Sequence, residues 1–167
     1  NPAPHGRPCH NSAVVLQNRR RLATAHKSLL PTYDVFDEGR YFEPASRVTV
    51  ADIAGRRTGI TICEDLWTAE YLPRDFYGRS PLDELAGSGI DLLLNLSASP
   101  FEAGKPVKRR AMLGAIARRL KVPLVYANLV GGNDQLVFDG HSLAFAADGN
   151  LAAELPGFRE SNALVTI

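Results

Sequence analysis

The stretch Thr58-Gly59-Ile60-Thr61-Ile62-Cys63-Glu64-Asp65-Leu66-Trp67 decides the fold and the chemistry that we expect of this chain. Apolar and β-branched residues run from 58 to 62, which is typical of a short, largely buried strand. Cys63 follows directly, and open α/β sheets bind ligands at the carboxyl ends of their strands. A thiol there suits a nucleophile, because backbone N–H groups of the next turn can receive the oxyanion that forms. A small, buried and inert cysteine is the alternative.

The composition is that of one ordinary globular domain. The 167 residues are 45% hydrophobic and 22% charged, with a formal net charge of +1 at pH 7, so no net field favours nucleic acid. Cys9 and Cys63 are too few for a disulfide framework or a cysteine-rich zinc site. No window has the apolar length of a membrane span, and no signal-peptide core opens the chain. We therefore expect a cytoplasmic protein with no metal site and no nucleic-acid or membrane partner.

Further strands and helices are expected on both sides of the opening stretch. The strands are 11–16, 22–26, 48–53, 90–96, 123–129, 141–146 and 151–155, the last two forming a hairpin. Ser80-Pro81 indicates the start of a short helix, since Ser can cap it and Pro suits its first position. Residues 29–42 are expected to form an ordered loop over the core, and residues 131–134 a turn. This order predicts a mixed sheet in a layered α/β fold.

The strongest helix pattern begins at Pro106. The stripe that we expect to be buried comprises Val107, Ala111, Met112, Ala115, Ile116 and Leu120. The basic residues off this stripe are Lys108, Arg109, Arg110, Arg118 and Arg119. We expect them to face solvent, because the near-neutral total charge argues against a nucleic-acid surface.

A nucleophilic Cys63 needs a base or a cation beside it. Lys27 ends the strand expected over 22–26, and its ammonium group could lower the pKa of the thiol and stabilise an oxyanion. His141 could form a Cys–His pair instead. The stronger pattern is the one with Lys27 and Cys63, each at the end of a strand.

Four blocks of sequence carry a resemblance to a known family. They are Lys27-Ser28-Leu29-Leu30-Pro31-Thr32-Tyr33-Asp34-Val35-Phe36-Asp37-Glu38, Ile62-Cys63-Glu64-Asp65-Leu66-Trp67, Asn95-Leu96-Ser97-Ala98-Ser99-Pro100 and residues 128–140. In this order they resemble the nitrilase (carbon–nitrogen hydrolase) superfamily. The first and last blocks most resemble the glutaminase domains of glutamine-dependent NAD synthetases. The resemblance implies a nitrilase-like α-β-β-α sandwich over residues 1–167, incomplete at its N-terminal side.

The resemblance also implies a role for particular residues. Cys63 resembles the nucleophile, Lys27 the lysine of a Glu–Lys–Cys triad, and Glu38 a second, supporting glutamate. The residues implied to line a glutamine pocket are Tyr33, Phe36, Glu64, Trp67, Ser97, Ser99 and Lys105. The implied reaction is hydrolysis of L-glutamine through a Cys thioester, releasing ammonia with which a synthetase domain amidates deamido-NAD. No cofactor is implied for this domain, ATP and Mg²⁺ are implied for the synthetase domain, and the whole protein is expected to be a homo-oligomer.

The chain departs from the family in two respects. The family's triad glutamate precedes the lysine, but no Asp or Glu precedes Lys27 here. The pyrophosphate loop of a synthetase domain does not occur either. We therefore expect this chain to be an internal piece of a longer protein that hydrolyses glutamine poorly, if at all, by itself. The alternatives are a stand-alone amidase of the same superfamily and a non-catalytic fragment.

Overall fold

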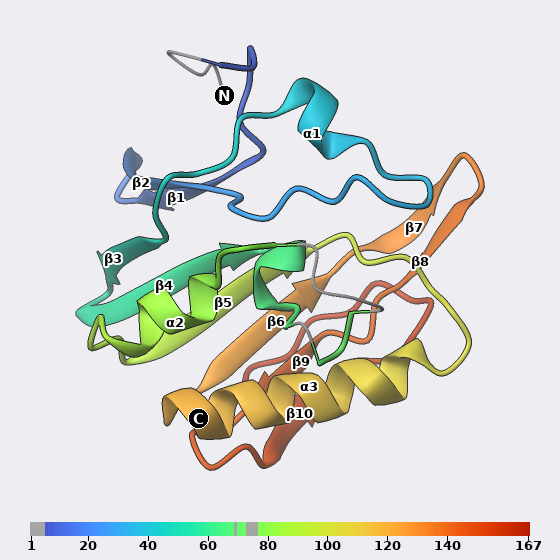
Figure 1. Cartoon of the computed structure of the whole chain (residues 1–167). Coiled ribbons are helices and arrows are strands. Elements are labelled where there is room, and N and C mark those ends of the chain that lie inside the picture. The colour runs from blue at the N-terminus through green and yellow to red at the C-terminus, as the bar shows by residue number, and fades with distance from the viewer. Residues whose placement is uncertain (1–5, 69, 73–76) are drawn as a thin grey trace. The chain divides into compact units, whose positions relative to one another are not determined.

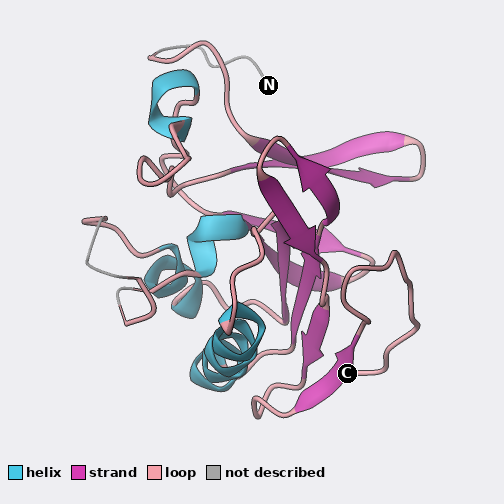
Figure 2. Cartoon of the chain, turned by 90° about the vertical axis from the view of Figure 1, so that its right-hand side faces the viewer, coloured by secondary structure: helices cyan, strands magenta, loops and turns pink. Residues whose placement is uncertain are grey.

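The computed structural model describes residues 6–68, 70–72 and 77–167. The chain divides into two compact units, residues 1–90 and residues 91–167. Figure 1 labels the helices and strands, and Figure 2 shows helices in cyan and strands in magenta. Within the described residues, no helix has both the length and the apolar character needed to cross a membrane.

The strands of the first unit form two antiparallel hairpins. β1 (Ser12–Gln17) pairs with β2 (Arg20–His26), and β3 (Thr49–Ile53) pairs with β4 (Arg56–Ile62). Their two-residue turns, Asn18-Arg19 and Ala54-Gly55, have positive φ at both positions, as tight hairpin turns with a right-handed twist require. All four strands were expected from the sequence, and the observed bounds differ from the expected ones by at most two residues.

Three short helical segments complete the first unit: α1 (Glu38–Tyr41), the 3₁₀ turn η1 (Cys63–Leu66) and α2 (Pro81–Ala86). The start of α2 is confirmed, since Ser80 Oγ accepts a hydrogen bond from the backbone N–H of Asp83 at 3.3 Å. α1 was not expected, because four residues are too few to show a helical period. The core of this unit includes Leu29, Ile60, Ile62, Leu66, Leu82 and Leu85.

The buried carboxylate of Asp65 joins two strand ends in this unit. Oδ1 accepts hydrogen bonds from the backbone N–H groups of Ser28 (2.9 Å) and Leu29 (2.8 Å), just beyond β2. Oδ2 accepts one from Ile62 (3.0 Å), the last residue of β4. Burial raises the pKa of Asp65 to about 6, although the three N–H donors and the charge of Lys27 favour the ionised form. A single side chain therefore fixes the backbone at the ends of both strands.

The second unit is a mixed sheet with a helical crossover. β5 (Leu92–Ser97) is parallel to β6 (Leu124–Asn128), β6 is antiparallel to β9 (Leu143–Phe145), and β9 is antiparallel to β10 (Leu151–Glu154). α3 (Lys105–Leu120) connects the parallel strands, because such a pair needs a long crossover. The expected mixed sheet and the final hairpin are confirmed.

A separate hairpin in the second unit was not expected. It joins β7 (Val130–Asn133) to β8 (Leu136–Asp139), where we expected only a turn over 131–134. Gly131 and Gly132 lie inside β7, and glycine weakens the sequence pattern of a strand because it has no side chain to pack. The turn itself lies at Asp134, which has a φ of 50°.

The buried face of α3 differs from the predicted stripe. Val107, Ala111 and Ala115 are exposed, whereas the buried residues are Arg109, Met112, Leu113, Gly114, Ile116 and Ala117. The prediction was therefore wrong for three apolar positions and for Arg109, which we expected to face solvent. The spacing of the buried residues is still helical, but the face is rotated toward the arginine.

Arg109 is buried because it has a carboxylate partner in its own unit. Its Nη1 and Nη2 each lie 3.1 Å from a carboxylate oxygen of Asp139, and neither side chain is exposed to solvent. The guanidinium carbon also lies 5.6 Å from the ring centroid of Tyr126, within cation–π range. Such a two-pronged pair matches the flat fork of arginine.

We expect Arg109→Ala to destabilise the chain by about 3–5 kcal/mol, because it leaves the Asp139 carboxylate buried without its counter-ion. The measurement is the free energy of unfolding in urea. Arg110→Ala, the next residue of the same helix, is the control: Arg110 pairs with Glu154 at the surface, and its loss should cost about 0–1 kcal/mol. Equal effects of the two substitutions would contradict the assigned burial.

We expect Asp65→Asn to destabilise the chain by about 1–3 kcal/mol at pH 8, since an amide NH₂ cannot accept the third backbone hydrogen bond. Because the pKa of Asp65 is raised to about 6 in the folded state, proton binding adds stability to the wild type. This proton-linked part is full below the unfolded pKa and is lost as the pH rises through 6. The difference between wild type and variant should therefore grow as the pH falls from 8 to 4. Asp52→Asn, at an exposed position of β3, serves as control and should show no such trend.

Candidate active site

Cys63 occupies a strained turn at the end of β4. Thr58 to Ile62 are all buried, and Cys63, the first residue of η1, is half-buried with a φ of 46°. A residue with a side chain rarely adopts this left-handed conformation, and such strain concentrates at functional sites. The turn places the thiol at the carboxyl end of the strand, where the sequence predicted it.

Lys27 lies directly after β2 and forms an ion pair with Glu38. Its Nζ is 2.7 Å from Glu38 Oε1, and the exposed fraction of the lysine side chain is only 2%. The lysine backbone is held on both sides, since its N–H donates to Asn11 O (2.8 Å) and its carbonyl accepts from Ala45 N–H (2.9 Å). The pair therefore fixes the lysine side chain as well as its backbone.

Glu64 is a buried carboxylate held by two phenols. Tyr33 Oη donates to Glu64 Oε1 at 2.6 Å, and Tyr77 Oη donates to the same oxygen at 3.2 Å. Glu64 Oε2 has no hydrogen-bond partner in the described part of the chain, and no described cation pairs with this carboxylate. One oxygen is thus fixed, while the other can receive a donor from a ligand.

The charges of these groups converge on Tyr33. Burial, followed by the hydrogen bond to Glu64 and the charges of Glu64, Cys63 and Glu38, raises the pKa of Tyr33 far above its usual value. The phenol therefore stays protonated and donates at any ordinary pH. Coulomb effects weaken with distance. Cys63, Glu64 and Glu38 therefore lie near enough to the Tyr33 phenol to raise its pKa.

Phe36 and Trp67 flank this cluster in the sequence. Phe36 is half-buried, and its ring meets that of Tyr33 edge to face, with 6.1 Å between centroids. Trp67 is half-buried and closes η1, since its N–H donates to Glu64 O at 2.9 Å. Both are therefore placed in the same unit as Cys63.

The other three predicted pocket residues lie in the second unit. Ser97 ends β5 and its Oγ donates to Asn95 Oδ1 at 2.7 Å. The backbone N–H of Ser99 donates to Asn128 Oδ1 at 2.9 Å. Lys105 is the first residue of α3. His141, the alternative base, is in this unit as well, with its Nδ1 3.1 Å from Glu154 Oε1.

Two residues of the cluster were missed by sequence reasoning. Tyr77 contributes the second phenol on Glu64, yet nothing in its local sequence marks it. Asp65 was given no role of its own, although three backbone N–H groups bind it. A second acid directly after Glu64, between apolar residues on both sides, was the available signal.

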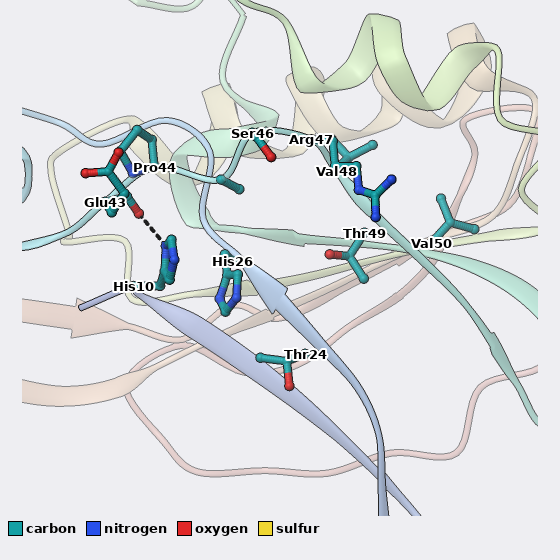
Figure 3. A pocket seen from close by; sticks show the side chains of 11 residues that line it. His10, Thr24, His26, Glu43, Pro44, Ser46, Arg47, Val48, Thr49 and Val50 are labelled. Atoms are coloured by element: carbon teal, nitrogen blue, oxygen red, sulfur yellow. Dashed lines mark hydrogen bonds between the residues drawn. The ribbon is translucent and has the colours of Figure 1, made fainter. Parts of the chain in front are cut away.

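A large hollow in the first unit involves other residues. It has a volume of about 740 Å³ and is lined by His10, Thr24, His26 and residues 43–50. Figure 3 shows the stacked rings of His10 and His26, whose centroids are 4.1 Å apart. None of the predicted site residues lines it. Within the described ranges, no cluster of three or more His, Cys, Asp or Glu side chains is placed to hold a metal ion.

Known proteins resemble this chain over most of its length. The glutamine-dependent NAD(+) synthetase of Synechocystis sp. is 44% identical over 157 residues, which cover 93% of this chain and 28% of that protein. The structure of glutamine-dependent NAD+ synthetase from Acinetobacter baumannii with ADP matches with a TM-score of 0.84 and 35% identity, over 96% of this chain and 28% of the other. The chain thus spans little more than a quarter of the length of these relatives.

A shorter enzyme has a similar structure. An amidase of the nitrilase superfamily from Nesterenkonia, in a mutant form, matches with a TM-score of 0.66 and 26% identity, over 83% of this chain and 47% of its own. These similarities confirm the nitrilase-like α/β fold expected from the sequence. The carbon-nitrogen hydrolase family model matches residues 3–167. The chain therefore belongs to the carbon–nitrogen hydrolase family.

Proposed function

We propose that this chain is part of a glutamine amidohydrolase that supplies ammonia for NAD synthesis. The observation that carries the proposal is the carboxylate of Glu64, directly after Cys63, which two phenols hold by one oxygen. A buried carboxylate with an open oxygen suits an ammonium group. Glutamine carries such a group, whereas simple amides do not.

The chemistry assigned to Cys63 is nucleophilic. Its thiolate attacks the γ-carbonyl carbon, and the oxyanion of the tetrahedral intermediate is stabilised by nearby donors and the Lys27 ammonium. The intermediate collapses with cleavage of the C–N bond, and the general base that took the thiol proton returns it to the leaving nitrogen, which departs as ammonia. Water then attacks the γ-glutamyl thioester, which releases glutamate and regenerates the thiol.

Glu38 and a further carboxylate complete this proposal. The ion pair with Glu38, at 2.7 Å, keeps the Lys27 ammonium oriented. The family resemblance assigns the general base to a glutamate that precedes the lysine, but residues 1–26 contain neither Asp nor Glu. In our proposal the base therefore comes from outside residues 1–167, and the chain alone turns over glutamine poorly.

The product ammonia would pass to a synthetase domain that uses ATP and Mg²⁺ to amidate deamido-NAD. The support is the similarity to glutamine-dependent NAD(+) synthetases, of whose length this chain covers 26–28%. Pocket roles for Tyr33, Phe36 and Trp67, which share a unit with Cys63, belong to the same proposal, as does a homo-oligomeric whole protein.

A stand-alone amidase is the second candidate, supported by the similarity to the Nesterenkonia enzyme. The two functions differ in the substrate they need. A glutaminase should depend on the α-ammonium group, while a simple amidase should not. Activity tests below use the complete natural polypeptide that contains these residues.

We expect Glu64→Gln to raise the KM for glutamine by about ten- to a hundredfold, because a charge-assisted hydrogen bond to the α-ammonium is lost. Hydrolysis of glutaramate, which is glutamine without its amino group, should not change. Steady-state kinetics on both amides is the measurement. Glu102→Gln, at an exposed position, is the matched control. An equal loss on the two substrates would exclude Glu64 as the ammonium site.

We expect a diazo-ketone analogue of glutamine to alkylate Cys63 and to leave Cys9 unmodified. Cys63 lies among the charged groups around Tyr33, whereas Cys9 contacts the chain at Phe42 by a backbone bridge, and thiolate character controls reactivity. Peptide mass mapping reads the result, and Cys63→Ala should abolish labelling. Modification of Cys9 with Cys63 intact would refute the assignment.

A further inference from the structure

Arg79 and Glu84 form an ion pair at the start of α2, within the unit that carries Cys63. Arg79 Nη2 lies 2.9 Å from Glu84 Oε2, and Arg79 Nε donates to Glu84 Oε1, so the contact is two-pronged. This hydrogen bonding raises the pKa of Arg79 and lowers the pKa of Glu84, so both groups stay charged at neutral pH. A guanidinium held in this way by a carboxylate has a fixed direction.

The ion pair leaves one donor and one acceptor for the backbone of the segment 45–48. Arg79 Nη1 donates to the carbonyl of Ala45 at the start of the segment. Glu84 Oε2 accepts from the backbone N–H of Val48, at its end, at 3.2 Å. The pair therefore holds the segment at both ends.

The same segment holds the main chain of Lys27. The backbone N–H of Ala45 donates to the Lys27 carbonyl at 2.9 Å, while the carbonyl of Ala45 accepts from Arg79. Asp65, which binds the backbone just beyond Lys27, contributes through its charge to the raised pKa of Arg79. Because Coulomb effects weaken with distance, the guanidinium lies near this strand end.

The stretch of chain that carries Arg79 also carries Tyr77. Tyr77 Oη donates to Glu64 Oε1 at 3.2 Å. The bonds of the Arg79 guanidinium fix the chain two residues after this phenol, and Ser80, the next residue, caps α2. The position from which Tyr77 reaches Glu64 is therefore set by the anchored arginine.

We propose that Arg79 is a positioning residue for two parts of the candidate site. It holds the main chain of Lys27, and it holds the segment from which Tyr77 reaches Glu64. The inference rests on the proposed function, in which Lys27 stabilises the oxyanion and Glu64 binds the α-ammonium group of glutamine. The guanidinium itself binds Glu84 and a backbone carbonyl, so it takes no part in the reaction.

The two roles predict a split in the kinetics of the complete natural polypeptide on glutamine and glutaramate. In Arg79→Ala, kcat should fall about tenfold on both amides, because Lys27 serves the γ-carbonyl that they share. KM should rise about five- to tenfold for glutamine alone, because only glutamine has the α-ammonium group that Glu64 binds. Arg79→Lys keeps the charge without the fork and should show the same split at a smaller size. Arg56→Ala, at an exposed position of β4, is the control and should match wild type.

A double-mutant cycle with Tyr77→Phe tests whether the effect on KM depends on the phenol. Tyr77→Phe alone should raise the KM for glutamine about five- to tenfold, as expected for one lost hydrogen bond. The variant with both substitutions, Arg79→Ala and Tyr77→Phe, should have the KM of Tyr77→Phe within about twofold, because residues that act through one contact are not additive. Two independent, merely structural effects would instead multiply.

Hydrogen exchange supplies a readout that needs no reaction. In Arg79→Ala, the Ala45 amide should exchange about tenfold faster than in wild type, because its segment has lost one of its two anchors. The Ile62 amide, which is bonded to Asp65 Oδ2, is the internal control and should be unchanged. Equal acceleration at both amides would show a general loss of stability and overturn the inference.

Three kinetic results would also overturn the inference. They are an unchanged kcat or an unchanged KM for glutamine in Arg79→Ala, a KM that rises on both amides, and additive effects in the cycle. Wild type that hydrolyses glutaramate as well as glutamine would instead overturn the proposed function, and the exchange result would then decide this inference.

Discussion

The carboxylate of Asp65 is the constraint on which the candidate site depends. Three backbone N–H groups bind it, two of them just beyond β2 and one at the end of β4. This carboxylate therefore gives the two strand ends that carry Lys27 and Cys63 a common hydrogen-bond acceptor. Burial opposes the charge and raises the pKa of Asp65 to about 6, so the fold retains a carboxylate at a cost in solvation.

Other residues of the first unit are also held in energetically costly positions. Lys27 and Glu64 are almost completely buried, and Cys63 adopts a left-handed backbone conformation. None of these features favours stability by itself. Buried charges and a strained backbone concentrated within one unit are typical of functional sites. The chain that carries this arrangement belongs to the carbon–nitrogen hydrolase family.

The second unit shows how a sequence pattern can mislead on burial. Apolar spacing in α3 predicted that Val107 and Ala111 face the core, but both are exposed while Arg109 is buried. Hydropathy treats every arginine as a surface residue, because burying an unpaired charge is costly. Asp139, thirty residues away, removes that cost. The spacing of apolar residues within one helix carries no information about a partner so far along the chain.

The sequence by itself determined every strand except those of the β7–β8 hairpin, the position of Cys63 at the end of β4, the position of Lys27 after β2, and the resemblance to the carbon–nitrogen hydrolase family. These depend on local hydrophobic runs and on short blocks of residues, which are read directly along the chain. Only the tertiary structure decided that Tyr77 shares Glu64 with Tyr33, that Asp65 bridges two strand ends, and that Arg109 pairs with Asp139. Each of these contacts joins residues from different segments, and their directions in space are set by packing rather than by neighbouring residues.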